Sequence, residues 1–149
     1  MGNTYVSCYI HYVFSTKNHE QWLIPEIREK LYPYFGGIAR ENNFKLIKAG
    51  GIEDHVHLLV SLPATVSVSK AIKYIKGGSS RWIHENFKNM YSFSWQEGYG
   101  AFSISRSLLE KTIAYIENQE QHHRHKTFRE EIIEFLEYHG IEFDEKYLI

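Results

Sequence analysis

Cysteine and an excess of either charge are what this sequence most clearly lacks. Cys8 is the only cysteine in 149 residues, which excludes a disulfide framework and a cysteine-based zinc site and is typical of a reducing compartment. The 17 Lys and Arg residues nearly balance 18 Asp and Glu residues, which excludes a uniformly basic nucleic-acid-binding protein. Polar or charged residues interrupt every apolar stretch, so none is long enough to span a bilayer.

Size and composition favour one compact unit. With 43% hydrophobic and 15% aromatic residues, the chain has enough apolar side chains for one core, and we expect a single domain over residues 1–149. The first residues, MGNTYVS, lack the basic start and apolar run of a secretory signal. We therefore expect a cytoplasmic protein.

The charges are unevenly distributed along the chain. Acidic residues gather near the C-terminus, from Glu130 and Glu131 to Glu145, whereas the segment from 70 to 81 carries only basic charges, at Lys70, Lys73, Lys76 and Arg81. Such a basic segment is a candidate for phosphate contacts, with a solvated helix face as the alternative.

Apolar spacing predicts both strands and helices. Alternating, aromatic or β-branched residues predict strands over 5–14, 44–49 and 54–61 and a bent strand over 93–104. A helical period predicts helices over 25–42, 68–87, 108–121 and 128–139. Some boundaries of these strands and helices are also predicted. Gly50-Gly51 predicts a turn, Ser107 an N-cap, Thr127 with Glu130 a capping box, and Gly140 the end of the last helix.

The order of these elements predicts the fold class. The β-α-β-β-α-β succession over about 5–104 is the ferredoxin-like, split βαβ pattern, an α+β fold with an antiparallel sheet and helices on one face, as in RRM domains. Two further helices, over about 108–121 and 128–139, follow this core.

His55 and His57 are the most informative residues in the chain. They lie one residue apart in a predicted strand, so their side chains share one face, while Val56, Leu58 and Val60 point to the other. Two imidazoles held side by side on a rigid element can form half of a divalent-metal site. A structural, hydrogen-bonded histidine pair is the alternative.

Tyr115 and Gln119 can supply the other half of such a site. They are four residues apart in the predicted helix over 108–121, so they share one helical face. A glutamine amide oxygen can bind a hard cation, and a tyrosine can act as a covalent nucleophile. Two imidazoles and one amide oxygen leave positions open for water and phosphate, which suits Mg²⁺ or Mn²⁺.

A second group of histidines follows that helix. His122, His123 and His125 lie among polar and basic residues, which favours a solvated basic linker. A role in a zinc site is the alternative, and a zinc hydrolase using His55, His57 and one of these three would be indifferent to Tyr115→Phe.

Three ordered motifs carry a family resemblance. DHVHL at 54–58, WQEGYGAFS at 95–103 and YIENQEQHH at 115–123 closely resemble the single-tyrosine HUH transposases, the small enzymes of insertion sequences that move as single-stranded DNA, and their relatives at repeated extragenic palindromes. The resemblance spans nearly the whole chain.

The resemblance implies specific roles. The HUH histidines fall on His55 and His57, the nucleophile on Tyr115 and the third metal-binding side chain on Gln119. It implies a homodimer whose tyrosine helix can complete the partner's histidine site, and recognition of DNA hairpins at element ends. Lys70, Lys73, Lys76 and Arg81 are then candidate DNA contacts.

The implied chemistry is metal-dependent cleavage and rejoining of single-stranded DNA through a 5′-phosphotyrosine link. A competing interpretation is a non-catalytic, RRM-like module that binds single-stranded nucleic acid through aromatic residues on its sheet. That module would need neither the paired histidines nor a covalent adduct.

Overall fold

The computed structural model describes residues 2–149 and is built on four strands. The strands are β1 (Tyr9–Ser15), β2 (Lys45–Gly51), β3 (His55–Ser61) and β4 (Gly100–Ile104). The helices are α1 (Pro25–Glu41), α2 (Val68–Asn86), α3 (Leu109–Glu117), α4 (Gln119–His122) and α5 (Phe128–Tyr138). Within residues 2–149, no helix is long and apolar enough to cross a membrane.

The strands form one antiparallel sheet in the order β2-β3-β1-β4. The two middle strands are therefore β3 and β1, and each β-α-β half contributes one middle and one edge strand. This order is the ferredoxin-like arrangement, so the predicted fold class is confirmed. In the register, His57 lies opposite Val13 and His55 opposite Ser15.

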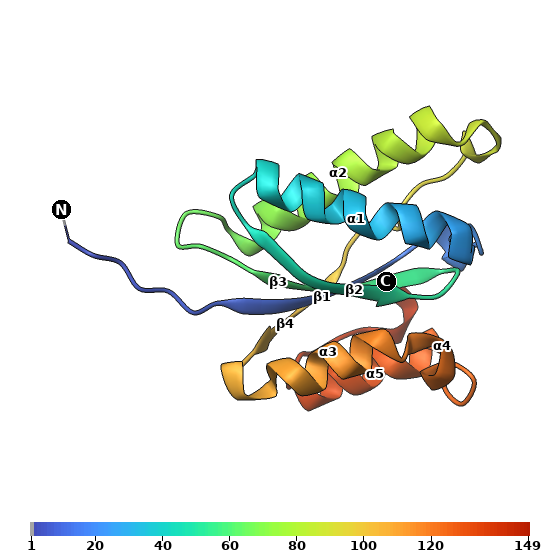
Figure 1. The fold of residues 1–149 in the computed structure, drawn as a ribbon. Helices are drawn as coiled ribbons and strands as arrows, with labels where there is room; N and C mark the ends of the chain where they lie inside the picture. The colour runs from blue at the N-terminus through green and yellow to red at the C-terminus, as the bar shows by residue number, and fades with distance from the viewer. Residues whose placement is uncertain (1) are drawn as a thin grey trace.

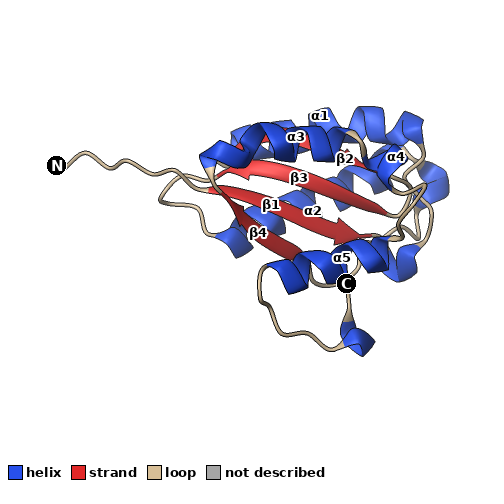
Figure 2. Cartoon of the chain, turned by 90° about the horizontal axis from the view of Figure 1, so that it is seen from below, coloured by secondary structure: helices blue, strands red, loops and turns tan. Residues whose placement is uncertain are grey.

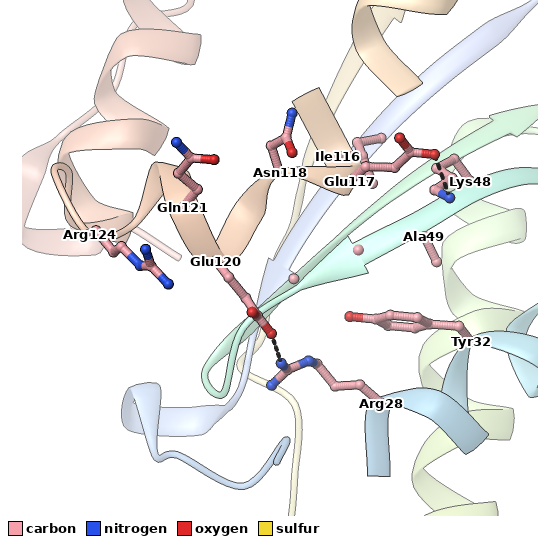
Figure 3. A pocket seen from close by; sticks show the side chains of 12 residues that line it. Arg28, Tyr32, Lys48, Ala49, Ile116, Glu117, Asn118, Glu120, Gln121 and Arg124 are labelled. Atoms are coloured by element: carbon pink, nitrogen blue, oxygen red, sulfur yellow. Dashed lines mark hydrogen bonds and ion pairs between the residues drawn. The ribbon is translucent and has the colours of Figure 1, made fainter. Parts of the chain in front are cut away.

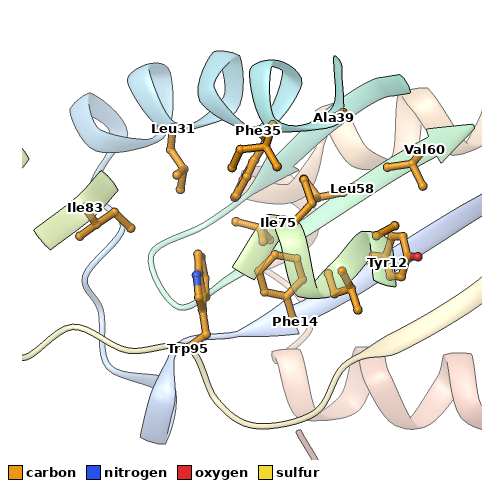
Figure 4. Packing of buried hydrophobic residues seen from close by; sticks show 14 of the residues in the cluster. Tyr12, Phe14, Leu31, Phe35, Ala39, Leu58, Val60, Ile75, Ile83 and Trp95 are labelled. Carbon is orange, nitrogen blue, oxygen red and sulfur yellow. The ribbon is translucent and has the colours of Figure 1, made fainter. Parts of the chain in front are cut away.

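The larger hydrophobic core lies between the sheet and helices α1 and α2, which cover the same face (Figure 1). From the strands, Tyr12, Phe14, Leu58 and Val60 point into this core and meet Leu31, Phe35 and Ile75 from the helices, as Figure 4 shows. The alternation predicted for the histidine strand is confirmed, because Val56, Leu58 and Val60 all belong to this core.

Helices α3, α4 and α5 cover the opposite face of the sheet (Figures 1 and 2). A smaller cluster there joins Val13 and Phe102 from the sheet to Phe128 and Ile132 from α5. His11, Val13 and His57 are buried beneath this layer. An RRM-like module needs an open sheet face for stacking bases, and this face is covered.

Several predicted boundaries differ from the structure. The first strand begins at Tyr9 rather than Tyr5, which is exposed. The helix predicted over 108–121 is two helices separated by Asn118, and Ser107 does not cap it; Leu108 is the N-cap residue and its side chain makes no cap hydrogen bond. By contrast, the Thr127–Glu130 capping box is present, and Gly140 follows α5 in a left-handed conformation.

Gly50 and Gly51 end strand β2 instead of forming the predicted turn. A Cβ at Gly50 would lie 2.1 Å from the carbonyl oxygen of Ile116 in α3, and one at Gly51 would lie 2.2 Å from the carbonyl oxygen of His55. The missing side chains therefore let α3 approach the sheet and let β2 turn closely into β3.

Candidate metal and tyrosine site

His55 and His57 point together into the layer between the sheet and α3–α5, and both are fully buried. The Nδ1 atom of His55 is 2.8 Å from Oδ1 of Asp54, and the ring of His55 stacks on Phe128 with centroids 4.2 Å apart. The pattern prediction that both imidazoles share a face is confirmed. Their Nε2 atoms converge on one point.

His11 supports His57 from the neighbouring strand β1. Its Nε2 atom lies 2.8 Å from Nδ1 of His57, and its side chain is buried. With Nδ1 engaged, His57 can direct Nε2 into the site. Burial lowers the pKa of His57 to about 4 and that of His11 well below its ordinary value, so both imidazoles are neutral at neutral pH.

Gln119 and His123 enter the site from α4 and its C-terminal cap. The Oε1 atom of Gln119 is 3.3 Å from Nε2 of His55 and 3.0 Å from Nε2 of His123. The Nδ1 atom of His123 is 2.7 Å from the carbonyl oxygen of Lys126. The solvated-linker prediction is therefore wrong for His123, whose side chain is 4% exposed. It holds for His125, which is exposed.

Glu131 on α5 occupies the middle of the cluster and is 1% exposed. Its Oε1 atom lies 3.0 Å from Nε2 of His57, 3.2 Å from Nε2 of His123 and 3.4 Å from Nε2 of His55. One donor atom each from these three histidines and Glu131 lies within 4.8 Å of the others, a spacing that could hold a metal ion.

The charges in this cluster depend on one another. Burial opposes ionisation of Glu131, but hydrogen bonds with His123, His55 and His57 outweigh it and lower the pKa of the carboxyl. Burial lowers the pKa of His55, yet its bonds to Asp54 and Glu131 outweigh burial and leave that pKa raised. The cluster therefore favours a carboxylate facing at least one positive charge.

Tyr115 reaches the same carboxylate from α3. Its hydroxyl donates a hydrogen bond to Oε2 of Glu131 and lies 3.1 Å from Nε2 of His122. Burial and the negative charge of Glu131 raise the pKa of the Tyr115 phenol. The structure thus brings Tyr115, Gln119, His55 and His57 together within one chain.

The Tyr115 side chain also borders a groove of about 660 Å³ between β4, α3 and α5. Apolar side chains of Leu108 and Phe135 line it together with Lys111. Glu131 lies at the same groove, so a bound molecule could meet both the phenol and the carboxylate.

A family model described as "Transposase IS200 like" matches residues 4–119, most of the chain. The chain belongs to this family. The transposase is 27% identical over 124 residues to the transposase for insertion sequence element IS200 of Salmonella typhimurium, covering 80% of this chain and 81% of that protein. It is 25% identical over 114 residues to the ISDra2 transposase TnpA of Deinococcus radiodurans, covering 73% of this chain and 81% of that protein.

Two solved structures share the fold of this chain. A crystal structure of a protein from Deinococcus radiodurans R1 is similar with a TM-score of 0.66 and 26% identity, covering 80% of this chain and 96% of that one. The structure of a REP-associated tyrosine transposase bound to a REP hairpin shares the fold with a TM-score of 0.56 and 16% identity, covering 78% and 68%.

Two ion pairs connect helices α3 and α4 of this transposase to other elements of the same chain. Lys48 on β2 pairs with Glu117 on α3 at 2.8 Å, and Arg28 on α1 pairs with Glu120 on α4 at 2.7 Å (Figure 3). Both pairs line a polar pocket of about 490 Å³ at this edge of the sheet. They flank the break at Asn118 and so hold both short helices in place.

The basic residues predicted to contact DNA lie away from the histidine site. Lys70, Lys73, Lys76 and Arg81 belong to α2, on the other face of the sheet from the histidines (Figure 1). The Lys76 ammonium donates hydrogen bonds to the carbonyl oxygens of Gln96 and Gly98, whereas the other three side chains are exposed. The structure does not bring these four residues to the histidine site.

Two buried residues of the site, His11 and Glu131, are not among the residues predicted from the sequence. In the sequence, Glu131 is one of several acidic residues near the C-terminus. A signal is nonetheless present, because Phe128, Ile132 and Phe135 mark the apolar face of α5 and Glu131 lies on that face. The side chains of His11 and Val13 lie on the same face of β1, the face that α3–α5 cover.

Proposed function

We propose that this transposase cleaves and rejoins single-stranded DNA through a 5′-phosphotyrosine intermediate on Tyr115, using Mg²⁺ or Mn²⁺ held by His55, His57 and Gln119. One observation carries the proposal. A buried pair of imidazoles and a tyrosine hydroxyl meet at one carboxylate, and an amide oxygen lies beside one of these imidazoles, within a protein of the transposase family.

The residues present fit a divalent cation. Asp54 and His11 engage the Nδ1 atoms of His55 and His57 and leave the Nε2 atoms for a ligand. Gln119 adds an amide oxygen, the kind of donor that hard cations accept. A bound divalent cation would neutralise charge that develops on the scissile phosphate.

In the step assigned to Tyr115, one phosphodiester bond replaces another. The phenol oxygen attacks phosphorus, the bond from phosphorus to the 3′ oxygen breaks, and a free 3′-hydroxyl is released. The phenol loses one proton and the leaving oxygen gains one. A 3′-hydroxyl from another strand end can reverse the step, so rejoining needs no nucleotide cofactor. The phenol is protonated before the reaction, because its pKa is raised.

The proposed substrate is a single strand next to a hairpin at an element end. The groove beside Tyr115 offers apolar walls for unpaired bases and Lys111 for a phosphate. The similar REP-associated transposase is described as bound to a hairpin, which supports this choice. Lys70, Lys73 and Arg81 would contact duplex phosphates on the other face, and a homodimer would bring two such units to paired element ends.

The test is formation of a covalent adduct. Labelled single-stranded oligonucleotides that span the hairpins flanking the coding sequence are incubated with the protein and Mg²⁺ or Mn²⁺. The mixture is then denatured and resolved. Label should remain on the wild-type protein, should vanish with Tyr115→Phe or EDTA, and should persist with Tyr91→Phe, a change at an exposed tyrosine distant from the site.

Two results would contradict the proposal. One is the absence of label with every flanking hairpin while the metal is bound. The other is cleavage that survives Tyr115→Phe, which would instead favour a metal-activated hydrolase.

A further inference from the structure

The hydrogen bonds of the histidine cluster determine which ring nitrogens carry a hydrogen, and therefore what faces the Glu131 carboxylate. The partners of Nδ1 are the Asp54 carboxylate for His55 and the Lys126 carbonyl for His123, and both accept only. Each Nδ1 therefore carries the hydrogen. In a neutral ring, Nε2 then directs a lone pair toward Oε1 of Glu131, at 3.4 Å and 3.2 Å. Two such lone pairs would repel the carboxylate oxygen, so the cluster needs a positive charge, which a proton on Nε2 or a divalent cation among these donor atoms can supply.

We propose that His123 and Glu131 complete the metal site, and that Glu131 links this site to the nucleophile Tyr115. The inference rests on the proposed function, because it deepens the divalent-metal site assigned there. It also goes beyond the family match, since residues 4–119 include neither His123 nor Glu131.

The two carboxylate oxygens of Glu131 face different partners. Oε1 faces the three imidazoles, whereas Oε2 accepts the hydrogen bond from Tyr115 and lies 3.2 Å from Nε2 of His122. Oε1 of this buried side chain is therefore placed to bind a cation, and Oε2 holds the Tyr115 phenol through a hydrogen bond. Glu131 is in this way a ligand and a positioning residue.

This donor set changes the metal preference expected for the site. Three imidazole nitrogens, one carboxylate oxygen and the Gln119 amide oxygen form a nitrogen-rich site. Mg²⁺ prefers oxygen ligands and retains its waters, whereas imidazole binds Mn²⁺ and later transition metals more readily. The site should therefore bind Mn²⁺ more tightly than Mg²⁺.

Direct metal binding tests the ligand assignment without any DNA. The metal-free full-length protein is titrated calorimetrically with MnCl₂ and with MgCl₂. Glu131→Gln keeps the size of the side chain but removes its charge, and His123→Ala removes one imidazole. Each should weaken Mn²⁺ binding by at least the roughly 10- to 100-fold that follows loss of an outer partner. His125→Ala and Glu137→Gln, changes at exposed residues nearby, should bind as wild type does.

The results separate this inference from the proposed function. If His57→Ala loses Mn²⁺ while Glu131→Gln and His123→Ala bind like wild type, the two added ligands are refuted and the proposed site stands. If wild type and His57→Ala both fail to bind, the proposed metal site itself fails, and this inference with it. Thermal unfolding of each metal-free variant identifies any loss of binding that comes from unfolding; for a variant that unfolds, Glu131→Asp or His123→Gln takes its place.

The positioning role has its own measurement. At saturating Mn²⁺, single-turnover adduct formation is followed against oligonucleotide concentration. Glu131→Gln should lower the maximal rate at least tenfold while leaving the half-saturating DNA concentration within about twofold, because the phenol is misplaced while the groove is intact. An unchanged maximal rate would overturn the link between Glu131 and Tyr115.

Discussion

The side chains of His11 and His57 lie on adjacent strands and join through a 2.8 Å contact between Nε2 and Nδ1. The register places His11 opposite Leu59 rather than opposite His57, so the contact is diagonal across the strand pair. Both rings are buried beneath the layer formed by α3 and α5. The orientation of His57 therefore depends on His11.

His11→Ala should weaken Mn²⁺ binding by about 10- to 100-fold, because outer partners orient metal ligands. His57 would keep its place on β3 but lose the contact that holds its ring. Calorimetric titration of the metal-free protein measures the change, with His125→Ala as the matched control at an exposed histidine. Wild-type affinity in His11→Ala would show that the ring of His57 is held by packing alone.

The first three strands and most helices follow from local periodicity, to within a few residues, whereas the strand predicted over 93–104 extends only over Gly100–Ile104. Helices α1, α2 and α5 lie within about two residues of their predicted bounds, and the shared face of His55 and His57 follows from the two-residue period of a strand. The break at Asn118 has no comparable signal, because the sequence keeps a helical pattern across it.

The rest of the site depends on contacts between distant segments. His123 looks like part of a polar linker until the turn after α4 brings it against His55, with ring centroids 4.5 Å apart. Glu131 acquires its role only because α5 packs across the sheet face that bears the histidines. Neither approach can be derived from spacing along the chain.

Gly50→Ala should destabilise the protein by about 1–3 kcal/mol, the usual cost of overpacking, and reduce adduct formation. The new Cβ would collide with the Ile116 carbonyl oxygen and push α3, with Tyr115, away from the sheet. Denaturant unfolding and the labelled-adduct assay measure both effects.

Gly77→Ala is the matched control. A Cβ there meets nothing within 4 Å, so this change should raise the free energy of unfolding by up to about 1 kcal/mol. Equal stabilities of the two variants would contradict the close packing of α3.

Thr127→Ala should lower the free energy of unfolding by about 1 kcal/mol at neutral pH, because it removes the N-cap of α5. The effect should shrink in acid. Hydrogen bonds from Thr127 lower the pKa of Glu130 in the folded state, so the carboxylate stabilises the fold above its unfolded pKa, and this contribution is lost as pH falls. Urea unfolding of wild type and variant at pH 7 and near pH 4 tests the difference. A larger gap at the lower pH would contradict the capping box.

The same chain supplies both the histidines and the tyrosine of its site. Glu131 accepts a hydrogen bond from the hydroxyl of Tyr115, the Lys48–Glu117 pair joins α3 to β2, and the Arg28–Glu120 pair joins α4 to α1 of the same chain. The family resemblance instead implies that a partner's tyrosine helix can complete the site. The two arrangements predict opposite results for mixed variants.

Tyr115→Phe mixed with His57→Ala, after co-refolding to exchange subunits, should form no phosphotyrosine adduct if each chain uses its own Tyr115. Each mixed dimer would then contain one site without a nucleophile and one site without a complete metal site. In the shared arrangement, the intact histidines of one subunit would meet the intact tyrosine of the other, and label would reappear on the His57→Ala chain. A size tag on one variant identifies the labelled chain. Mixing wild type with Tyr115→Phe verifies that refolding restores activity, and separation of the mixed species by the size tag under native conditions verifies exchange, so an unlabelled variant mixture reports the arrangement.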